Sequence, residues 1–297
     1  MYTFVEKRIE KDEAELASWY QKQEEKNIFP TDVILERDIP YMNDGVRTHE
    51  MDIYRPKKVT GKFPVIMDFH GGGLITGDRR LNKWFAGEMA SRGFIVCSIG
   101  YPLVPQRDIC GLLRDSYQGV VTAIEMLGEF AGDPDRIYMC GDSAGGFVAT
   151  YLTAIQNNAK IAKSAGIETK EFQIKALGTI SGLFYTGRID KHGFVILRKY
   201  YYGDKFRKNP FWKYVNPENR EVMEGLPAIF GVTSKADFLN DNTLKYNKAL
   251  EKAGKSMKLF YYGDKDELTH DFVIMKPELP ETKEVLDNLA RFFNENY

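Results

Sequence analysis

Residues 136–156 read RIYMCGDSAGGFVATYLTAIQ, and this stretch decides the fold. The segment RIYMC is typical of a buried strand, and the segment that begins GGFVATYL favours a helix. The turn between them is a G-x-S-x-G motif made of Gly141, Asp142, Ser143, Ala144 and Gly145. Glycines on both sides of the serine leave room for a sharp, strained turn that lifts the hydroxyl clear of the sheet. We therefore predict that Ser143 is a nucleophile.

A glycine run follows the apolar segment PVIMDF and consists of His70, Gly71, Gly72 and Gly73. Ester hydrolysis develops negative charge on the carbonyl oxygen, and glycines let backbone N–H groups approach that oxygen. We expect the donors to be the N–H groups of Gly72, Gly73 and Ala144. The alternatives are a simple chain reversal or a phosphate loop. Neither the G-x-x-x-x-G-K-[ST] pattern nor a G-x-G-x-x-G pattern in a βαβ unit is present, which argues against a phosphate loop.

A serine hydroxyl is a weak nucleophile near neutral pH, so it needs a base, which is usually histidine. The chain has four histidines: His49, His70, His192 and His270. We expect His70 to hold the glycine loop in shape, His49 to lie in an early polar strand and His192 to lie in an inserted segment. His270 remains, in a loop after the strand-like run MKLFYYG. The order serine, acid, histidine along the chain agrees with this choice.

The acid that orients the histidine must lie between the serine and the histidine and follow a strand. The candidates are Asp237 and Asp241 in AIFGVTSKADFLND, and Asp264 and Asp266 in the loop before the histidine. Asp237 is favoured because it lies just past the end of a strand-like run. Asp241 could equally cap the helix that follows. Closeness in sequence does not by itself make Asp264 or Asp266 a partner of the histidine.

Short β-rich runs alternate with helical stretches along the chain. The strand candidates are TDVILERDI, HEMDIYRP, FPVIMDFH, FIVCSIGY, RIYMCG, FQIKALGTIS, AIFGVTS and MKLFYYG. From Phe63 onward they are apolar without clean alternation, which is typical of a mostly parallel sheet covered on both faces. The first two alternate more and are candidates for an antiparallel edge. The predicted class is α/β, with helices at 4–26, 80–91, 111–130, 144–157, 243–254 and 281–295.

Residues 183–225 are longer than a single crossover helix requires. We interpret them as a cap or lid inserted into a catalytic domain of residues 41–182 and 226–297, preceded by a lead-in of residues 1–40 with an amphipathic helix. Aromatic residues in the insertion could form its own small core or line an apolar acyl or alcohol pocket. They are Phe184, Tyr185, Phe194, Tyr200, Tyr201, Tyr202, Phe206, Phe211, Trp212 and Tyr214.

Composition excludes several classes of protein. Of 297 residues, 43% are hydrophobic and 28% are charged, which indicates a globular protein. The formal net charge is −1, which favours a small-molecule partner and argues against nucleic acid. The N-terminus lacks the apolar stretch of a signal peptide, and no apolar run is long enough for a membrane span. We expect a cytoplasmic protein without metal or organic cofactor, in which Cys97, Cys110 and Cys140 are free thiols.

The glycine loop and the serine turn together resemble the hormone-sensitive-lipase-like branch of the α/β-hydrolases, bacterial carboxylesterases in particular. The resemblance extends over most of the chain from about Val65. It includes the segments DPDRI at 133–137, YPLVP at 101–105, ADFLND at 236–241 and HDF at 270–272. It implies an α/β-hydrolase fold with a small helical cap, formed by the N-terminal helix and the insertion. Because the first aspartate of the family's acid motif is catalytic, it also favours Asp237 over Asp241.

Three positions depart from the family's pattern. Pro102 stands where arginine is usual, Phe238 where proline is usual and Asp271 where glycine is usual. We expect none of the three to touch a reacting group, so these departures bear on the substrate and not on the presence of activity.

The expected function is that of a serine carboxylesterase, which hydrolyses short to medium acyl esters, including aryl or acetylated-sugar esters, through an acyl-enzyme. One alternative is an amide hydrolase, such as an aryl formamidase or a small peptidase. Another is a ligand-binding homologue that has lost catalysis. That alternative predicts a missing triad member, whereas Ser143, Asp237 and His270 are all present. The oligomeric state stays open, and a homodimer is compatible with the sequence.

Overall fold

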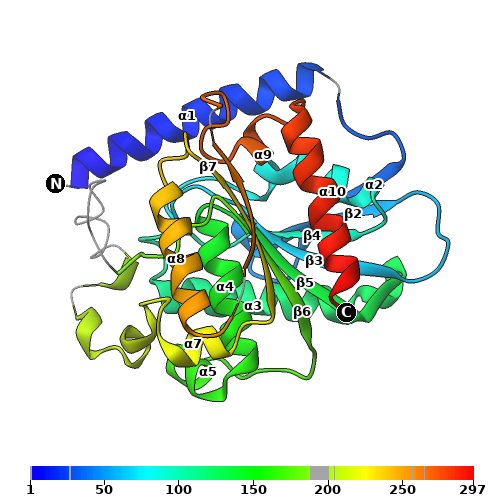
Figure 1. Ribbon diagram of the computed structural model, residues 1–297. Coiled ribbons are helices and arrows are strands. Elements are labelled where there is room, and N and C mark those ends of the chain that lie inside the picture. The colour runs from blue at the N-terminus through cyan, green and yellow to red at the C-terminus, as the bar shows by residue number, and fades with distance from the viewer. Residues whose placement is uncertain (1, 27, 188–200, 204, 256, 264) are drawn as a thin grey trace.

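The computed structural model describes residues 2–26, 28–187, 201–203, 205–255, 257–263 and 265–297. Within them, an eight-stranded sheet forms the centre of the molecule (Figure 1). Its strands are β1 (Val33–Pro40), β2 (Glu50–Pro56), β3 (Phe63–Phe69), β4 (Ile95–Ile99), β5 (Gly132–Asp142), β6 (Ile174–Ile180), β7 (Ala228–Ser234) and β8 (Met257–Tyr262). Their order across the sheet is β1-β2-β4-β3-β5-β6-β7-β8.

The strands β3 to β8 are parallel, and β1 and β2 add an antiparallel edge. All eight predicted strands are present, and the mostly parallel sheet with an antiparallel edge is confirmed. β3 is buried along its whole length, as expected for a strand covered on both faces.

Helices cover both faces of the sheet. The α-helices are α1 (Tyr2–Lys26), α2 (Lys83–Ser91), α3 (Ile109–Glu125), α4 (Ala144–Asn157), α5 (Ala159–Ala165), α7 (Arg220–Glu224), α8 (Asn240–Lys252), α9 (Phe272–Met275) and α10 (Pro280–Glu295). Short 3-10 helices are η1 (Arg47–His49), η2 (Arg79–Asn82), η3 (Leu127–Phe130), η4 (Phe206–Lys208) and η5 (Pro210–Tyr214). One core joins α3, α4, α5 and α8 to the sheet, and a second core joins α2, α9 and α10 to its other face.

The predicted helices are present, with ends shifted by a few residues. The sequence pattern missed α5, α7 and α9, which have seven, five and four residues. Helices this short contain too few turns to show the 3.6-residue period of an amphipathic helix.

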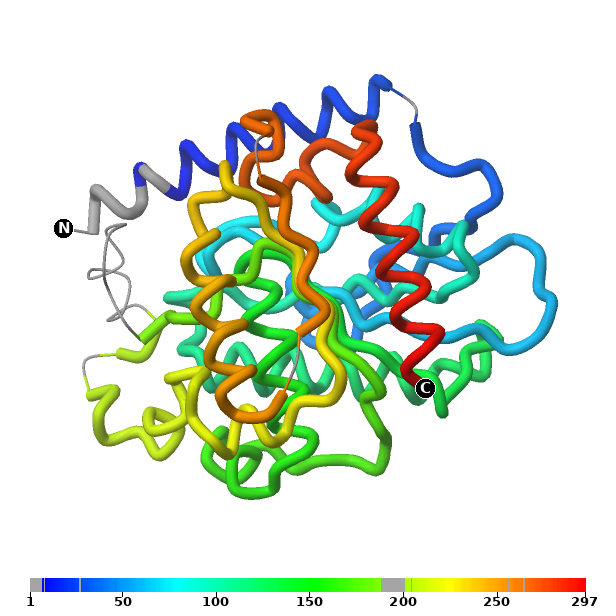
Figure 2. Tube along the Cα trace, viewed as in Figure 1, coloured from blue at the N-terminus to red at the C-terminus, as the bar shows by residue number. Residues whose placement is uncertain are grey.

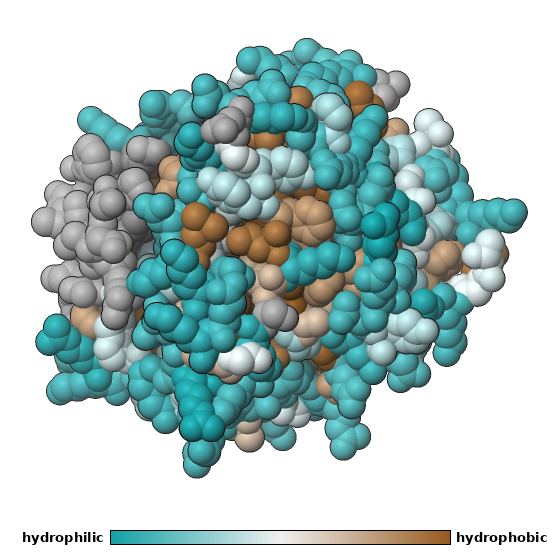
Figure 3. All heavy atoms as spheres, in the orientation of Figure 1, coloured by the Kyte–Doolittle hydropathy of each residue, from teal (hydrophilic) through white to brown (hydrophobic). Residues whose placement is uncertain are grey.

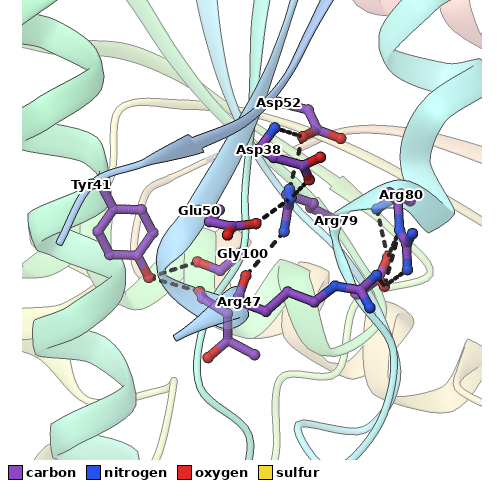
Figure 4. Close-up of polar contacts among 10 residues, drawn as sticks. Asp38, Tyr41, Arg47, Glu50, Asp52, Arg79, Arg80 and Gly100 are labelled. Carbon is purple, nitrogen blue, oxygen red and sulfur yellow. Dashed lines mark hydrogen bonds and ion pairs between the residues drawn. The ribbon is translucent and has the colours of Figure 1, made fainter. Parts of the chain in front are cut away.

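The guanidinium of Arg79 joins η2 to the antiparallel edge of the sheet (Figure 4). Its Nε lies 2.8 Å from Oδ1 of Asp52, and its Nη2 lies 2.8 Å from Oε2 of Glu50 and also bonds Asp38. Its Nη1 donates to the carbonyl of Arg47 at 3.0 Å. Arg79 is only 1% exposed, so this network fixes η2 against β1 and β2 from inside the protein.

The C-terminal part of α1 docks on α2 and on the end of α9. Nε1 of Trp19 donates to the carbonyl of Met275 at 3.0 Å, and the rings of Trp19 and Tyr20 pack on Trp84 at centroid distances of 5.5 and 5.4 Å. Figures 1 and 2 show α1 lying across the end of the molecule where α9 lies. The amphipathic helix predicted in the lead-in thus docks through the aromatic rings of Trp19 and Tyr20.

The described part of the insertion packs against α4 and α5. Oη of Tyr151 donates to the carbonyl of Tyr214 at 2.8 Å, and the rings of Phe206 and Trp212 lie 4.3 Å apart. His192, Phe194 and Tyr200 lie outside the described residues. The other eight aromatic residues are buried, apart from the half-buried Trp212. All seven buried rings belong to the core that joins α3, α4, α5 and α8 to the sheet, and Trp212 packs against it, so the expectation that the segment has a small core of its own was wrong.

β8 is the edge strand of the sheet on the side opposite β1. Its residues Leu259, Phe260 and Tyr262 are half-buried, and Tyr261 is exposed. Figure 3 shows apolar side chains at the surface between α8 and α10, where β8 lies. Apolar side chains of this strand therefore reach the surface of the molecule.

Candidate active site

Ser143 occupies the turn between β5 and α4. Its backbone has φ 46° and ψ −113°, outside the conformations that residues other than glycine usually adopt. Two hydrogen bonds hold this turn: its N–H donates to the carbonyl of Ile180, and its carbonyl accepts from the N–H of Leu183, both at 2.8 Å. A side chain at Gly145 would overlap the carbonyl of Phe69, so the close approach of α4 to β3 requires this glycine.

A continuous hydrogen-bond chain joins Ser143, His270 and Asp237. Oγ of Ser143 lies 2.9 Å from Nε2 of His270, and Nδ1 of His270 lies 2.7 Å from Oδ1 of Asp237. The parallel strands β5, β7 and β8 end at the same edge of the sheet, and the turns and loops after them supply these side chains. The structure therefore brings together the three residues that the sequence selected.

The carboxylate of Asp237 is fixed by groups near the end of β7. Oδ1 accepts from the N–H of Leu239 at 2.8 Å, and Oδ2 accepts from Oγ1 of Thr233 at 3.0 Å. Burial alone would raise the pKa of Asp237, but the hydrogen bond from His270 and its charge lower it below the usual value. The carboxylate thus stays ionised and can orient the imidazole.

The imidazole of His270 binds its proton tightly. Burial lowers the pKa of His270, but the charges of Asp271 and Asp237 and their hydrogen bonds outweigh burial and raise the pKa to about 10. An isolated catalytic histidine would be mostly neutral at pH 7. The carboxylates of Asp271 and Asp237 thus account for the direction of the shift.

The other candidates for acid and base lie elsewhere. Asp241 lies in the first turn of α8, whose N-cap residue is Leu239, so its alternative role as N-cap was wrong. Asp266 is exposed in the loop after β8, and Asp264 lies outside the described residues. His49 is the buried last residue of η1, so its expected place in an early polar strand was wrong, and its Nδ1 lies 2.6 Å from Oδ2 of Asp44.

The side chain of His70 is buried and contacts the glycine loop. Its ring stacks on Tyr101 with centroids 4.2 Å apart, and its Nδ1 lies 2.6 Å from the carbonyl of Gly71. Burial lowers the pKa of His70 to about 4, so the ring is neutral. Oη of Tyr101 donates to the carbonyl of His70 at 2.6 Å, and Oη of Tyr201 donates to the carbonyl of Gly73 at 2.8 Å.

The bonds from Tyr101 and Tyr201 engage carbonyl groups of the glycine loop and not its amides. Gly72 and Gly73 have φ of 114° and 63°, which glycine adopts readily. Within the described part of the chain, the N–H groups of Gly72, Gly73 and Ala144 donate to no backbone oxygen.

A buried polar chain behind the serine was not predicted. Nδ2 of Asn82 lies 2.8 Å from Oδ1 of Asp142 and 3.1 Å from both carboxylate oxygens of Asp68. Oγ of Ser98 lies 2.9 Å from Oδ2 of Asp68. A sequence signal did exist, because Asp68 is a charged residue inside the apolar run PVIMDF. Asn82 carries no such signal, because it lies in the short helix η2.

Two departures from the family pattern lie against the imidazole. Oδ2 of Asp271 lies 3.0 Å from Nε2 of His270, and the ring of Phe238 lies 4.1 Å from the imidazole between centroids. The expectation that neither would touch a reacting group was wrong. Asp271 has φ 53°, and this left-handed backbone accounts for the glycine that is usual at the position.

Cys97, Cys110 and Cys140 are free and buried. Across the described ranges, no group of three or more His, Cys, Asp or Glu side chains is arranged to hold a metal ion. No helix among the described residues has the length and apolar composition needed to cross a bilayer.

The model of a protein family described as having the alpha/beta hydrolase fold matches residues 66–274. The chain belongs to the α/β-hydrolase family. The predicted α/β-hydrolase fold is thereby confirmed, together with the resemblance to the hormone-sensitive-lipase-like branch.

Curated relatives of this α/β-hydrolase include plant and bacterial proteins. A probable isoprenylcysteine alpha-carbonyl methylesterase of Arabidopsis thaliana is 26% identical over 227 residues, which cover 73% of this chain and 48% of the relative. A carboxylesterase of Mycobacterium tuberculosis is 27% identical over 241 residues, which cover 76% of this chain and 72% of the relative. The chain thus spans about half the length of the plant relatives that it matches.

Esterase B from Lactobacillus rhamnosis, solved with a tributyrin phosphonate, has a similar structure. It matches this α/β-hydrolase with a TM-score of 0.89 and 21% identity, over 97% of this chain and 94% of that chain. At this identity, the match establishes the fold alone.

Proposed function

We propose that this α/β-hydrolase is a serine carboxylic ester hydrolase. The observation that carries the proposal is the hydrogen-bond chain from Oγ of Ser143 through His270 to Asp237, at 2.9 and 2.7 Å. A nucleophile, a base and a residue that orients the base are the parts that acyl transfer needs. The names of the relatives, a methylesterase and a carboxylesterase, support the same reaction class.

In the proposed reaction, Oγ of Ser143 attacks the ester carbonyl carbon while Nε2 of His270 takes its proton. The amides of Gly72, Gly73 and Ala144 stabilise the negative charge on the carbonyl oxygen. His270 then donates the proton to the departing alcohol as the C–O bond breaks, which leaves an acyl group on Ser143. Water attacks this acyl group, gives a proton to His270, and releases the acid.

The proposed substrates are small-molecule esters with short to medium acyl chains, among them aryl or acetylated-sugar esters. The tributyrin phosphonate of the matched esterase B structure supports a short acyl chain. Residues 183–225 and α1 are proposed to form the cap over this site. The bond from Tyr201 to the carbonyl of Gly73 supports this role, because it links the insertion to the glycine loop. A homodimer and a cytoplasmic location stay predictions.

The first test compares wild type with Ser143→Ala and Asp237→Asn on p-nitrophenyl esters of increasing acyl length. We expect Ser143→Ala to lower kcat by roughly 10⁴-fold or more, and Asp237→Asn to lower it by about 10⁴-fold, because each removes one member of the chain. Asp241→Asn is the matched control, since Asp241 lies in the same segment outside that chain. A loss in Asp241→Asn instead of Asp237→Asn would show that the acid is misassigned.

A second experiment separates the competing functions. An organophosphonate should label Ser143, which peptide mass mapping would detect, and matched ester and amide substrates should show faster turnover of the ester. Preference for the amide would replace the esterase with an amide hydrolase. A protein without label on Ser143 would be a ligand-binding homologue.

A further inference from the structure

The imidazole of His270 has a carboxylate at each of its nitrogens. Asp237 lies 2.7 Å from Nδ1, and Oδ2 of Asp271 lies 3.0 Å from Nε2. Oγ of Ser143 lies 2.9 Å from the same Nε2. Two groups therefore compete for the one nitrogen that has to accept the proton of the serine.

The backbone fixes the side chain of Asp271 at this nitrogen. The N–H of Asp271 donates to Oγ of Ser181 at 3.1 Å, and its carbonyl accepts from the amides of Ile274 and Met275 at 2.9 and 2.8 Å. Its φ of 53° is a conformation that aspartate tolerates better than most residues. Since Asp271 is only 8% exposed, solvent does not screen its charge fully.

Proton placement follows from these distances. As a base, neutral His270 presents a lone pair at Nε2 and accepts the hydroxyl hydrogen of Ser143. A carboxylate 3.0 Å from that lone pair is repelled unless a proton lies between the two groups. The proton can belong to His270 or to Asp271, and in both cases Nε2 is not free to accept a second one.

We propose that Asp271 is a positioning residue that holds a proton at Nε2 of His270 in the resting site, so that hydrolysis requires this proton to leave first. The inference rests on the proposed roles of Ser143 and His270. Once the proton has left, the same carboxylate stabilises the imidazolium that forms during attack. Asp271 therefore slows the reaction at low pH and accelerates it at high pH.

The charges around the ring agree with this assignment. The charged groups that face the imidazole are Asp237 from the loop after β7 and Asp271 beside it, and Asp142 at the end of β5 interacts with both His270 and Asp271. The Phe238 ring packs on the imidazole. Burial raises the pKa of Asp271, and burial together with the charge of Asp271 raises the pKa of Asp142, which is the direction expected when acidic groups crowd a dry site.

The test is the pH profile of kcat/KM for wild type, Asp271→Gly and Asp271→Asn on p-nitrophenyl butyrate, from about pH 5 to about pH 11, which includes the wild-type midpoint expected at the His270 pKa of about 10. Both variants should move the midpoint of the acid limb down by about one to two pH units, because a nearby opposite charge shifts a pKa by about that amount. Each should be roughly tenfold faster than wild type near the acid end, and slower than wild type on the alkaline plateau.

Asp266→Asn is the matched control, because it removes an exposed carboxylate from the same loop and should leave the midpoint unchanged. If Asp271 had only a structural role, the variants would lose activity equally at every pH and the midpoint would stay in place. A shift in Asp271→Gly alone would assign the effect to backbone relaxation and overturn the inference. Phosphonate labelling of each protein separates the two proposals, since Ser143 without label would overturn the proposed function itself.

Discussion

Two polar clusters meet at η2, and they differ in how the charge of their carboxyl groups is neutralised. The Arg79 cluster consists of Arg79 with the carboxylates of Asp38, Glu50 and Asp52 (Figure 4). The Asp68 cluster consists of Asp68, Asn82, Ser98 and Asp142. A permanent cation organises the first cluster, whereas uncharged groups donate to Asp68 in the second: the amide of Asn82, the hydroxyl of Ser98 and the backbone N–H of Phe69.

The pKa values of the carboxyl groups in the Asp68 cluster reflect this difference. Burial raises the pKa of Asp68 to about 7, although hydrogen bonds from Ser98 and Asn82 act in the opposite direction. Burial also raises the pKa of Asp142 well above its usual value. These carboxyls therefore keep protons at pH values where an ordinary aspartate has lost its own.

Position explains why the two clusters differ. The Arg79 cluster joins η2 to the hairpin of β1 and β2, where only fixed geometry is required. The carboxyl of Asp142 precedes Ser143 and packs so closely on Gly71 that a side chain there would overlap it. A fixed negative charge at this point would oppose the negative charge that develops on the substrate oxygen. A protonated Asp142 next to the reacting groups avoids this repulsion.

The largest expected effect comes from removing the cation. Arg79→Met should lower the free energy of unfolding by about 3–5 kcal/mol, because the buried Asp52 would lose its partner. Urea unfolding followed by circular dichroism measures the change. Arg80→Met is the control, since the ion pair of Arg80 with Asp78 is partly exposed and should contribute at most about 1 kcal/mol. Equal effects of both changes would mean that the cation does not organise its cluster.

A smaller effect, which depends on pH, is expected at Asp68. Its folded-state pKa of about 7 lies above the usual value of 3.8, so the folded protein keeps a proton that the unfolded chain loses between these values. Wild-type stability therefore falls as pH rises through this window. Asp68→Asn has no such proton, so its stability relative to wild type should rise by about 2–4 kcal/mol from pH 4 to pH 7 and then level off.

Asp133→Asn is the control, because its stability relative to wild type should depend on pH in the opposite direction. Burial would raise the pKa of Asp133, but the hydrogen bonds from Arg136 and from the N–H of Asp135, together with the charges of Arg136 and Lys62, lower it. Wild type therefore loses this contribution as pH falls through the folded-state pKa. Unfolding curves across the pH range measure both variants. A difference between Asp68→Asn and wild type that does not change with pH would contradict the assignment of a proton to Asp68.

The sequence was sufficient to predict those parts of the fold and the candidate site that depend on a local pattern or on a small number of candidate residues. Eight strands followed from apolar runs, and the turn at Ser143 followed from a motif between a strand and a helix. His270 followed because the other three histidines had different expected positions. Each of these conclusions depends on neighbours along the chain or on a small number of alternatives.

The parts that the sequence did not predict depend on side-chain direction. Asn82 reaches Asp142, 60 residues away, and nothing in the residues around Asn82 signals this contact. The sequence shows that Asp271 stands where glycine is usual, but it does not show where the carboxylate points. The structure shows that the backbone is left-handed and that the carboxylate lies against Nε2 of His270. Contacts of this kind follow from how helices and loops pack on the sheet, and periodicity does not encode that packing.

The smallest effect is expected at Ser98, whose hydroxyl joins the two clusters. Oγ of Ser98 lies 2.9 Å from Oδ2 of Asp68 and 3.1 Å from the carbonyl of Arg79. Ser98→Ala should cost about 1 kcal/mol near pH 5, where Asp68 is protonated, and about 2 kcal/mol near pH 8, because hydrogen bonds to charged groups are stronger. The measurement is again urea unfolding, at these two pH values.

Ser116→Ala is the matched control, because Ser116 is equally buried but donates within its own helix, to the carbonyl of Leu112 at 2.8 Å. Its cost should be the same at both pH values. In the double variant Asp68→Asn/Ser98→Ala, the pH dependence of the Ser98 change should vanish, since no acceptor at position 68 would titrate. If it persisted, the hydroxyl would be responding to Asp142 or to the Arg79 cluster, and the two clusters would share one proton equilibrium instead of holding charge separately.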